Sequence, residues 1–126
     1  MLRSAGPGDL GFIRSLTGRP GYAAFNGDDD EAVLRARLAN PDERVLIWQG
    51  GDRRGFAIFR GLTGTGGIVE LFRIALDQPG GGAGDAFFRA LVDHAFHDFK
   101  ASRLWLDANA ENARAVKVYT RAGFRL

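Results

Sequence analysis

A strand, a glycine-rich turn, a helix and a second strand follow one another between residues 68 and 108, and no other feature of the sequence constrains the fold as strongly. Residues 68–76, IVELFRIAL, are mostly apolar, which is typical of a central strand. Apolar residues one turn apart predict a helix that ends near Phe99, and residues 102–108 predict the second strand. Two strands of one sheet that are joined in this way lie parallel, with a right-handed crossover.

The rest of the chain adds an antiparallel hairpin and three more helices. The residue patterns predict strands over 44–49 and 55–60, and helices over 9–20, 28–41 and 112–123. We expect Asp9 and Asn112 to cap their helices and Gly123 to end the last one. Residues 61–67, GLTGTGG, predict a flexible connection. The sequence therefore predicts one domain, residues 1–126, of the α/β class (α+β mixed sheet), with helices flanking a central mixed β-sheet.

The composition excludes several classes of protein. The chain has 126 residues, a net charge of +2 and no cysteine, so disulfides and thiolate metal sites are excluded. Its two histidines, His94 and His97, are too few for a histidine metal site. The basic residues are scattered, and all but Lys100 and Lys117 are arginine, which disfavours nucleic acid as a partner. We find no signal peptide and no apolar run of about 20 residues, so we expect a cytoplasmic protein without a membrane partner.

The glycine-rich turn, Gly80–Gly84, directly precedes the helix of the crossover unit. Helix N-termini attract anions, and glycines let the backbone approach a ligand closely. A P-loop is excluded, because Asp85 and Ala86 stand where lysine and serine or threonine are required. The dinucleotide pattern fails as well, because Asp85 or Phe87 occupies the position of its third glycine. From these residues alone, an anion-binding loop and a flexible connection are equally open.

The segment RIALDQPGGGAGDAFFRALVDHAF resembles the coenzyme A signature of the GCN5-related N-acetyltransferases (GNAT). In one register, residues 78–83 fit the family pattern Gln-x-x-Gly-x-Ala literally. In the other, which we favour, the helix is aligned first, so that residues 82–84 become the Gly-x-Gly and Pro79 stands where arginine or glutamine is usual.

The segment LWLDANAENARAVKVYTRAGF resembles the last motif of the same family. The matching residues are Asn112, Ala115, Tyr119, Gly123 and Phe124. The resemblance covers nearly the whole chain and implies a GNAT-like fold. It also implies an acyl-CoA-dependent N-acyltransferase, with acetyl-CoA as co-substrate and a primary amine, on a small molecule or a peptide N-terminus, as acceptor. The alternative is a catalytically idle acyl-CoA-binding module that serves in sensing or assembly.

The resemblance also implies which residues bind the co-substrate. The pyrophosphate is assigned to the backbone at Gly80, Gly81, Gly82, Ala83 and Gly84, with the anionic Asp85 beside it. The thioester carbonyl is assigned to the main chain near Ile74, Ala75 and Leu76, where the strand leaves its neighbour. Asn112 is assigned to the pantetheine arm, and no metal is required.

Three further residues are implied in catalysis, each with a structural alternative. Tyr119 is placed as the general acid that protonates the leaving thiolate, although its spacing also suits a core aromatic residue. Asp107 and Glu70 are the two candidate bases. The charge of Glu70 inside an apolar strand equally suits a solvated sheet face or an ion pair with Arg73.

The family usually continues into one more strand after the position of Leu126. The resemblance therefore implies a fold that lacks the final strand. An open strand edge beside apolar side chains favours pairing with another chain. From the sequence we expect either a homodimer across this edge or a longer natural chain.

Overall fold

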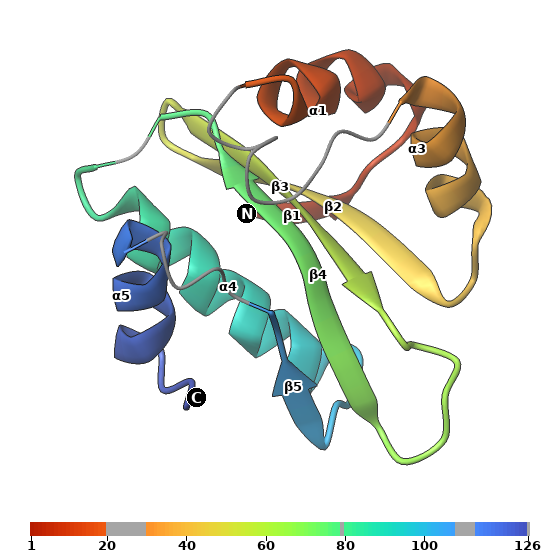
Figure 1. Cartoon of the computed structure of the whole chain (residues 1–126), viewed down its shortest axis with the longest axis vertical. Helices are drawn as coiled ribbons and strands as arrows, with labels where there is room; N and C mark the ends of the chain where they lie inside the picture. The colour runs from red at the N-terminus through yellow and green to blue at the C-terminus, as the bar shows by residue number, and fades with distance from the viewer. Residues whose placement is uncertain (20–29, 79, 108–112, 126) are drawn as a thin grey trace.

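The computed structural model describes residues 1–19, 30–78, 80–107 and 113–125. Its five strands are β1 (Leu2–Ser4), β2 (Glu43–Gly50), β3 (Arg53–Arg60), β4 (Ile68–Leu76) and β5 (Arg103–Trp105). They form one sheet in the order β1-β2-β3-β4-β5, in which only the β4–β5 pair is parallel. The mixed sheet and the parallel pairing of the two crossover strands are thus confirmed (Figure 1).

The helices cover both faces of the sheet. They are the 3₁₀ turn η1 (Pro7–Asp9), α1 (Leu10–Thr17), α3 (Glu31–Ala39), α4 (Ala83–His97) and α5 (Ala113–Arg121). Helices α1 and α3 lie on one face, whereas α4 lies on the other and carries α5 (Figure 1). Within the described ranges, no helix is long and apolar enough to cross a lipid bilayer.

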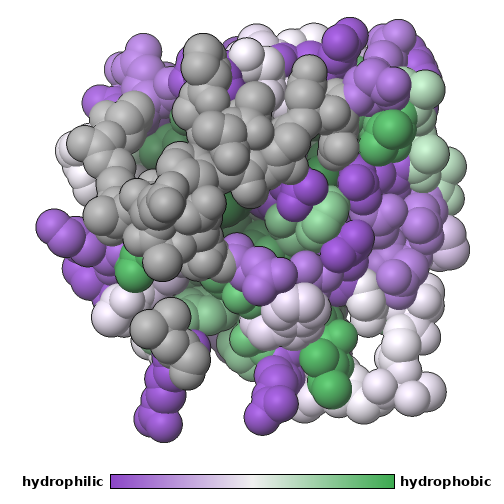
Figure 2. All heavy atoms as spheres, in the orientation of Figure 1, coloured by the Kyte–Doolittle hydropathy of each residue, from purple (hydrophilic) through white to green (hydrophobic). Residues whose placement is uncertain are grey.

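A separate hydrophobic core fills the space on each face of the sheet. The α1/α3 core contains the buried side chains of Leu10, Ile13, Leu16, Leu34, Val45, Ile47, Phe56 and Ile58. The α4 core contains those of Leu46, Trp48, Ala57, Phe59, Val69, Leu71, Phe87, Phe88, Leu91 and Ala95. Consecutive residues of β2 and β3 alternate between the two cores, as the pleat of a strand requires. On the face seen in Figure 2, hydrophobic side chains appear as separate patches among hydrophilic ones.

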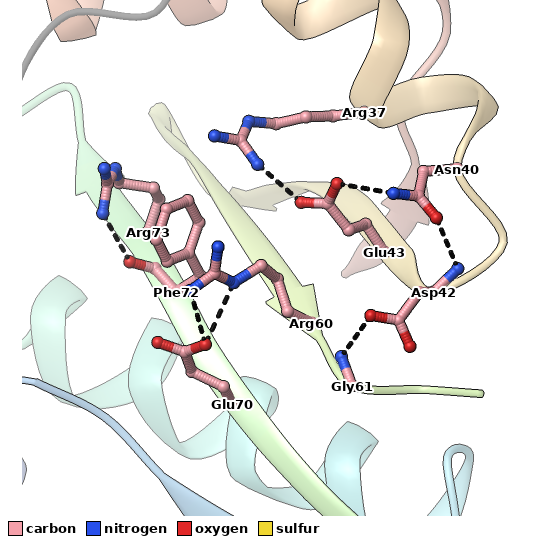
Figure 3. Close-up of polar contacts among 9 residues, drawn as sticks. All are labelled: Arg37, Asn40, Asp42, Glu43, Arg60, Gly61, Glu70, Phe72 and Arg73. Atoms are coloured by element: carbon pink, nitrogen blue, oxygen red, sulfur yellow. Dashed lines mark hydrogen bonds and ion pairs between the residues drawn. The ribbon is translucent and has the colours of Figure 1, made fainter. Parts of the chain in front are cut away.

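Strand β4 contains a bulge opposite Ile58 and Phe59 of β3. Arg73 pairs with Ile58 and Leu71 pairs with Phe59, so Phe72 is the additional residue. The bulge shifts the alternation of side chains by one residue. Phe72 and Arg73 therefore both point to the α1/α3 side of the sheet, which Figure 3 also shows.

The sequence prediction differs from the structure at several elements. Strand β1 was not predicted, and β5 spans three residues instead of the expected 102–108. Asp9 is the N-cap residue of α1 as predicted, but its side chain makes no capping hydrogen bond: the carboxylate instead accepts from the Gly6 N–H group (2.8 Å) and pairs with Arg3 (2.7 Å). Gly123 ends the last helix as expected, with φ at +101°. Asn112 lies outside the described residues.

The connection between β3 and β4 is anchored, although its glycines suggested a flexible loop. The Asp42 carboxylate accepts hydrogen bonds from the Thr63 hydroxyl (2.7 Å), the Thr63 N–H group (3.0 Å) and the Gly61 N–H group (3.2 Å). These bonds, the Thr63 hydroxyl first, lower the pKa of Asp42. The loop therefore depends on a side chain that lies about twenty residues earlier in the chain.

We predict that Gly55→Ala destabilises the fold by about 1–3 kcal/mol, a usual cost of overpacking. A Cβ at Gly55 would lie 2.7 Å from the Ala75 carbonyl oxygen and 2.7 Å from the Phe87 ring. Gly11→Ala is the matched control. A Cβ there would meet no atom within 4 Å, and the substitution replaces a glycine inside helix α1, where alanine is more favourable. Denaturant unfolding should show a loss of stability for the first variant and a small gain for the second. Equal stabilities would mean that β3 and α4 do not pack as described.

Candidate active site

The glycine turn before α4 has a defined backbone conformation. Gly80, Gly81 and Gly82 have φ angles of +98°, +63° and +79°, in the region that residues with a side chain rarely adopt. A Cβ at Gly80 or Gly82 would meet no atom within 4 Å. The glycines are thus required by the backbone conformation rather than by crowding, and they leave open space above the turn.

Helix α4 presents its N-terminus next to this space. Gly82 is the N-cap residue, and the Ala86 N–H group makes the first helical hydrogen bond, to the Gly82 carbonyl (3.1 Å). The Ala83 N–H group donates to Gly80 (3.2 Å). The N–H groups of Gly84 and Asp85 belong to the first turn, which has no helical carbonyl partner and carries partial positive charge. An anion can bind at such a position.

Asp85, in the first turn of α4, is paired with an arginine of α5. Its carboxylate makes a two-point ion pair with Arg121 of α5, at 3.0 Å and 3.1 Å. The arginine and aspartate side chains are 56% and 39% exposed, so the pair adds little to stability. Its main consequence is electrostatic, because it neutralises the carboxylate of the first turn of α4, beside the candidate anion site.

Three side chains, those of Asp77, Arg19 and Arg53, hold the start of the loop, and sequence reasoning missed them. The Asp77 carboxylate accepts hydrogen bonds from the N–H groups of Arg54 (2.9 Å) and Gln78 (2.8 Å). The guanidinium of Arg19 donates to the Asp77 carbonyl (2.7 Å), and that of Arg53 donates to the Gln78 carbonyl (2.8 Å). An aspartate at the end of a strand, before a proline and glycines, is a turn signal that could have identified Asp77.

Among the described residues, no strand pairs with the β5-facing edge of β4 beyond its first three residues. Pairing with β5 covers only Ile68, Val69 and Glu70 (Figure 1). The N–H group of Asp77 donates to Arg54 of β3 (2.8 Å), and the N–H groups of alternate residues point to opposite edges. The N–H group of Ala75 therefore points toward β3, whereas those at positions 74 and 76 point toward the open edge.

Tyr119 lies on α5, where its ring packs against Phe88 of α4 with the ring centroids 4.8 Å apart. Burial raises the pKa of Tyr119 above its usual value of 10.0, so the phenol keeps its proton at neutral pH. Its hydroxyl makes no hydrogen bond within the described ranges, and it is not a buried unsatisfied group, so solvent reaches it. It is therefore a protonated donor available to a ligand.

A groove of about 610 Å³ runs between β5 and α5. It is lined by Val92, Phe96, Leu104, Trp105, Leu106, Asp107, Val116, Tyr119, Thr120, Ala122, Gly123, Phe124 and Arg125. The groove brings together Tyr119 and the exposed Asp107, two of the three predicted catalytic residues.

Glu70, the third, points to the other face of the sheet. It pairs with Arg60, directly opposite on β3, and not with Arg73 as one interpretation of the sequence suggested (Figure 3). Both contacting nitrogens of Arg60 reach the same oxygen, Oε1, at 2.8 Å and 3.0 Å. Oε2 makes no hydrogen bond to the described residues. Within the described ranges, no three His, Asp or Glu side chains are grouped to hold a metal ion.

The profile of the acetyltransferase (GNAT) family matches residues 11–124. The chain belongs to this family. Aminoglycoside N(6')-acetyltransferase type 1 of Klebsiella pneumoniae is 38% identical over 61 residues, which are 48% of this chain and 30% of that protein. Spermine/spermidine N(1)-acetyltransferase of Bacillus subtilis (strain 168) is 32% identical over 89 residues, which are 64% of this chain and 58% of that protein. This GNAT chain thus matches less than two thirds of the length of either relative.

Solved structures of GNAT proteins share the fold over nearly the whole chain. A spermidine N-acetyltransferase from Vibrio cholerae, in complex with CoA and spermine, has a TM-score of 0.83 at 19% identity and covers 98% of this chain and 79% of its own. An aminoglycoside acetyltransferase, in complex with coenzyme A and kanamycin, has a TM-score of 0.81 at 23% identity, with coverage of 99% and 83%. The predicted GNAT-like fold is therefore confirmed.

The raised pKa of Tyr119 predicts a loss of stability at high pH. The unfolded chain ionises its tyrosine near pH 10, before the folded chain does, so the free energy of unfolding falls as the pH rises through and above 10. Tyr119→Phe should remove this part of the decline. Denaturant unfolding at pH 8 to 11 measures it, with Tyr22 present in both proteins. The same decline in both would mean that the phenol of Tyr119 is not desolvated.

Proposed function

We propose that this GNAT domain is an acetyl-CoA-dependent N-acetyltransferase that acts on a primary amine. One observation carries the proposal. A turn of three left-handed glycines opens the 15-residue helix α4 beside an unpaired edge of β4, so two sets of backbone N–H groups converge where one elongated anionic molecule can contact both. The family relatives named above are acetyltransferases, which supports the same function.

The chain has suitable groups for each part of the co-substrate. We assign the pyrophosphate to the backbone at Gly80–Gly84, where the missing Cβ atoms leave space and Asp85 is neutralised by Arg121. Arg53 and Arg19, already bonded to the start of the loop, add positive charge nearby. The pantetheine arm would extend along the open edge of β4, and we keep the assignment of Asn112 to it.

The reaction needs a polarised carbonyl, a neutral amine and a protonated leaving group. Acetyl-CoA supplies a thioester whose carbon–sulfur bond breaks as the amine nitrogen bonds to the carbonyl carbon. We assign the N–H group of Ile74 as the donor to the developing negative charge on oxygen, and that of Leu76, two residues along the strand, to another part of the co-substrate. One such donor is typically worth about 3 kcal/mol of transition-state stabilisation. Tyr119 gives its phenolic proton to the departing sulfur.

We propose Glu70 as the group that receives the proton of the amine. Its Oε2 makes no bond to a described residue, and Oε1 is fixed by Arg60. Asp107, the other candidate base, is exposed in the same groove as Tyr119, the proposed acid. Glu70, in contrast, lies on the other face of the sheet. Placing acid and base on different faces of the sheet suits an amine that approaches from the side opposite the thiol.

The competing hypothesis is an acyl-CoA-binding module without catalysis. The free and protonated hydroxyl of Tyr119 favours the enzyme, because a packing role needs no hydroxyl in contact with solvent. Binding of acetyl-CoA without release of free CoA, for every amine in a broad panel, would favour the module.

We predict that Gly82→Glu abolishes calorimetric binding of acetyl-CoA, because it adds bulk and negative charge at a residue with φ of +79°. Gly66→Glu is the matched control. Gly66 also has a positive φ (+92°) and open space, but it lies in the β3–β4 loop. Acetyl-CoA should raise the melting temperature of the wild type and the control, since a ligand of the folded state stabilises it. Equal binding by both variants would place the co-substrate elsewhere.

We predict that Tyr119→Phe lowers kcat by about 100- to 10,000-fold, the usual contribution of a general acid. The affinity for acetyl-CoA should change little, because phenylalanine keeps the packing against Phe88. Release of free CoA under single-turnover conditions measures the chemical step. An unchanged rate of that step would leave Tyr119 a structural residue.

A further inference from the structure

Three guanidinium groups surround one phenylalanine ring on the α1/α3 side of β4. The Cζ atoms of Arg60, Arg73 and Arg37 lie 3.5, 3.8 and 4.8 Å from the centroid of the Phe72 ring. Figure 3 shows the ring lying between Arg60 and Arg73. We call these four residues the arginine cluster.

Two of the three cations have a carboxylate partner, and the third has none in the described part of the chain. Arg60 pairs with Glu70 at 2.8 Å, and Arg37 pairs with Glu43 at 2.6 Å. Arg73 donates one hydrogen bond, to the carbonyl of the preceding residue (3.1 Å), and stacks on the ring. The three arginines and two glutamates therefore leave one positive charge, on a half-buried side chain.

The bulge in β4 sets the position of this charge. Without the additional residue, Phe72, the side chain of Arg73 would point toward the α4 core, as that of Leu71 does. With it, Arg73 points to the same face as Glu70 (Figure 3). Arg73 also directly precedes Ile74, whose N–H group faces the open edge of the strand. The cation thus stands one residue from the proposed reaction centre, on the side of the proposed base.

We propose that Arg73 binds a carboxylate of the acceptor, so that the amine to be acetylated belongs to a zwitterionic, amino-acid-like molecule. This inference rests on the proposed function, whose acceptor it specifies. A guanidinium that stacks on a ring through its face keeps N–H groups on its edge, and that planar edge matches a carboxylate. Binding the carboxylate would hold the neighbouring amine near Glu70.

The same charge disfavours polycationic acceptors. Spermine and kanamycin, which accompany CoA in the similar structures described above, carry several amines. A second cation close to Arg73 would be repelled, and Glu43 and Glu70, the carboxylates that pair with the arginine cluster, each already have an arginine partner. We therefore expect this chain to differ in acceptor class from those two proteins.

The first experiment compares each proteinogenic amino acid with its own carboxamide as acceptor, using acetyl-CoA and release of free CoA. Each pair differs in the carboxylate and retains the α-amine. We expect the wild type to prefer the carboxylate by about tenfold or more in kcat/KM, the usual value of a charged hydrogen bond. Arg73→Gln should reduce this preference to about twofold or less, mainly through KM.

Arg44→Gln is the matched control. Arg44 also lies over a phenyl ring, with its Cζ atom 5.7 Å from the centroid of Phe99, but it is exposed on β2 and faces the α4 side. This variant should keep the preference for the carboxylate. If Arg73→Gln does not fold, Arg73→Lys replaces it: the charge remains but the planar fork is lost, so the preference should weaken.

A second readout separates this inference from the proposed function. Calorimetry measures binding of the same amino acids and carboxamides to the protein saturated with CoA. Binding of the amino acid that is lost in Arg73→Gln, without turnover of any acceptor, would support the carboxylate site and overturn the acetyltransferase activity. Equal use of carboxylate and carboxamide, preference for spermine or kanamycin, or neither binding nor turnover of the amino acids would overturn the carboxylate site.

Discussion

The bulge in β4 is the constraint on which the rest of this site depends. Strand β4 contributes side chains to both hydrophobic cores, and the bulge changes which of these side chains enter each core. After the bulge, Ile74 and Leu76 pack on the α4 side while Ala75 packs on the α1/α3 side. A regular strand with the same sequence would reverse these three positions, and the charged residue at position 73 would enter an apolar core.

The cluster around Phe72 compensates for the irregular pairing at the bulge. A bulge leaves one residue of the ladder without a regular partner. Here that residue is Phe72, and its ring is held between cations that are themselves tied to neighbouring strands and helices. The ion pair between Arg60 and Glu70 crosses from β3 to β4 just before the bulge and fixes the register on its other side. The same group of residues thus surrounds the irregular position and fixes the register beside it.

Much of the fold was predictable, because its long elements have clear periodicity and end signals. Strands β2, β3 and β4 and helices α1, α3 and α4 all fall within three residues of their predicted ends. The three-residue strand β1 was not predicted, and β5, also three residues long, was predicted too long. So short a segment has no measurable period of hydrophobicity. The last helix was expected from residue 112 and is described from Ala113.

The motifs name candidate site residues, but they do not predict the surroundings of those residues. For Glu70 the sequence left open a solvated sheet face or an ion pair with Arg73, three residues away; it pairs instead with Arg60, ten residues away. Only the register of β3 against β4 brings those two side chains together, and that register depends on the anchored loop and on the bulge. The same reason explains why the carboxylate at position 77 was overlooked, since its partner amide belongs to another strand.

Helix α4 also fixes the distance between two parts of the proposed site. Its N-terminus forms the glycine turn, and its side chain Phe88, six residues further along, supports the ring of Tyr119. Because a helix rises about 1.5 Å per residue, these two points are about 9 Å apart along a rigid axis. Helix α5 packs mainly on α4, so a displacement of α4 would carry both points with it. In the proposed complex, one helix would therefore set the distance between the anchored end and the reacting end of the co-substrate.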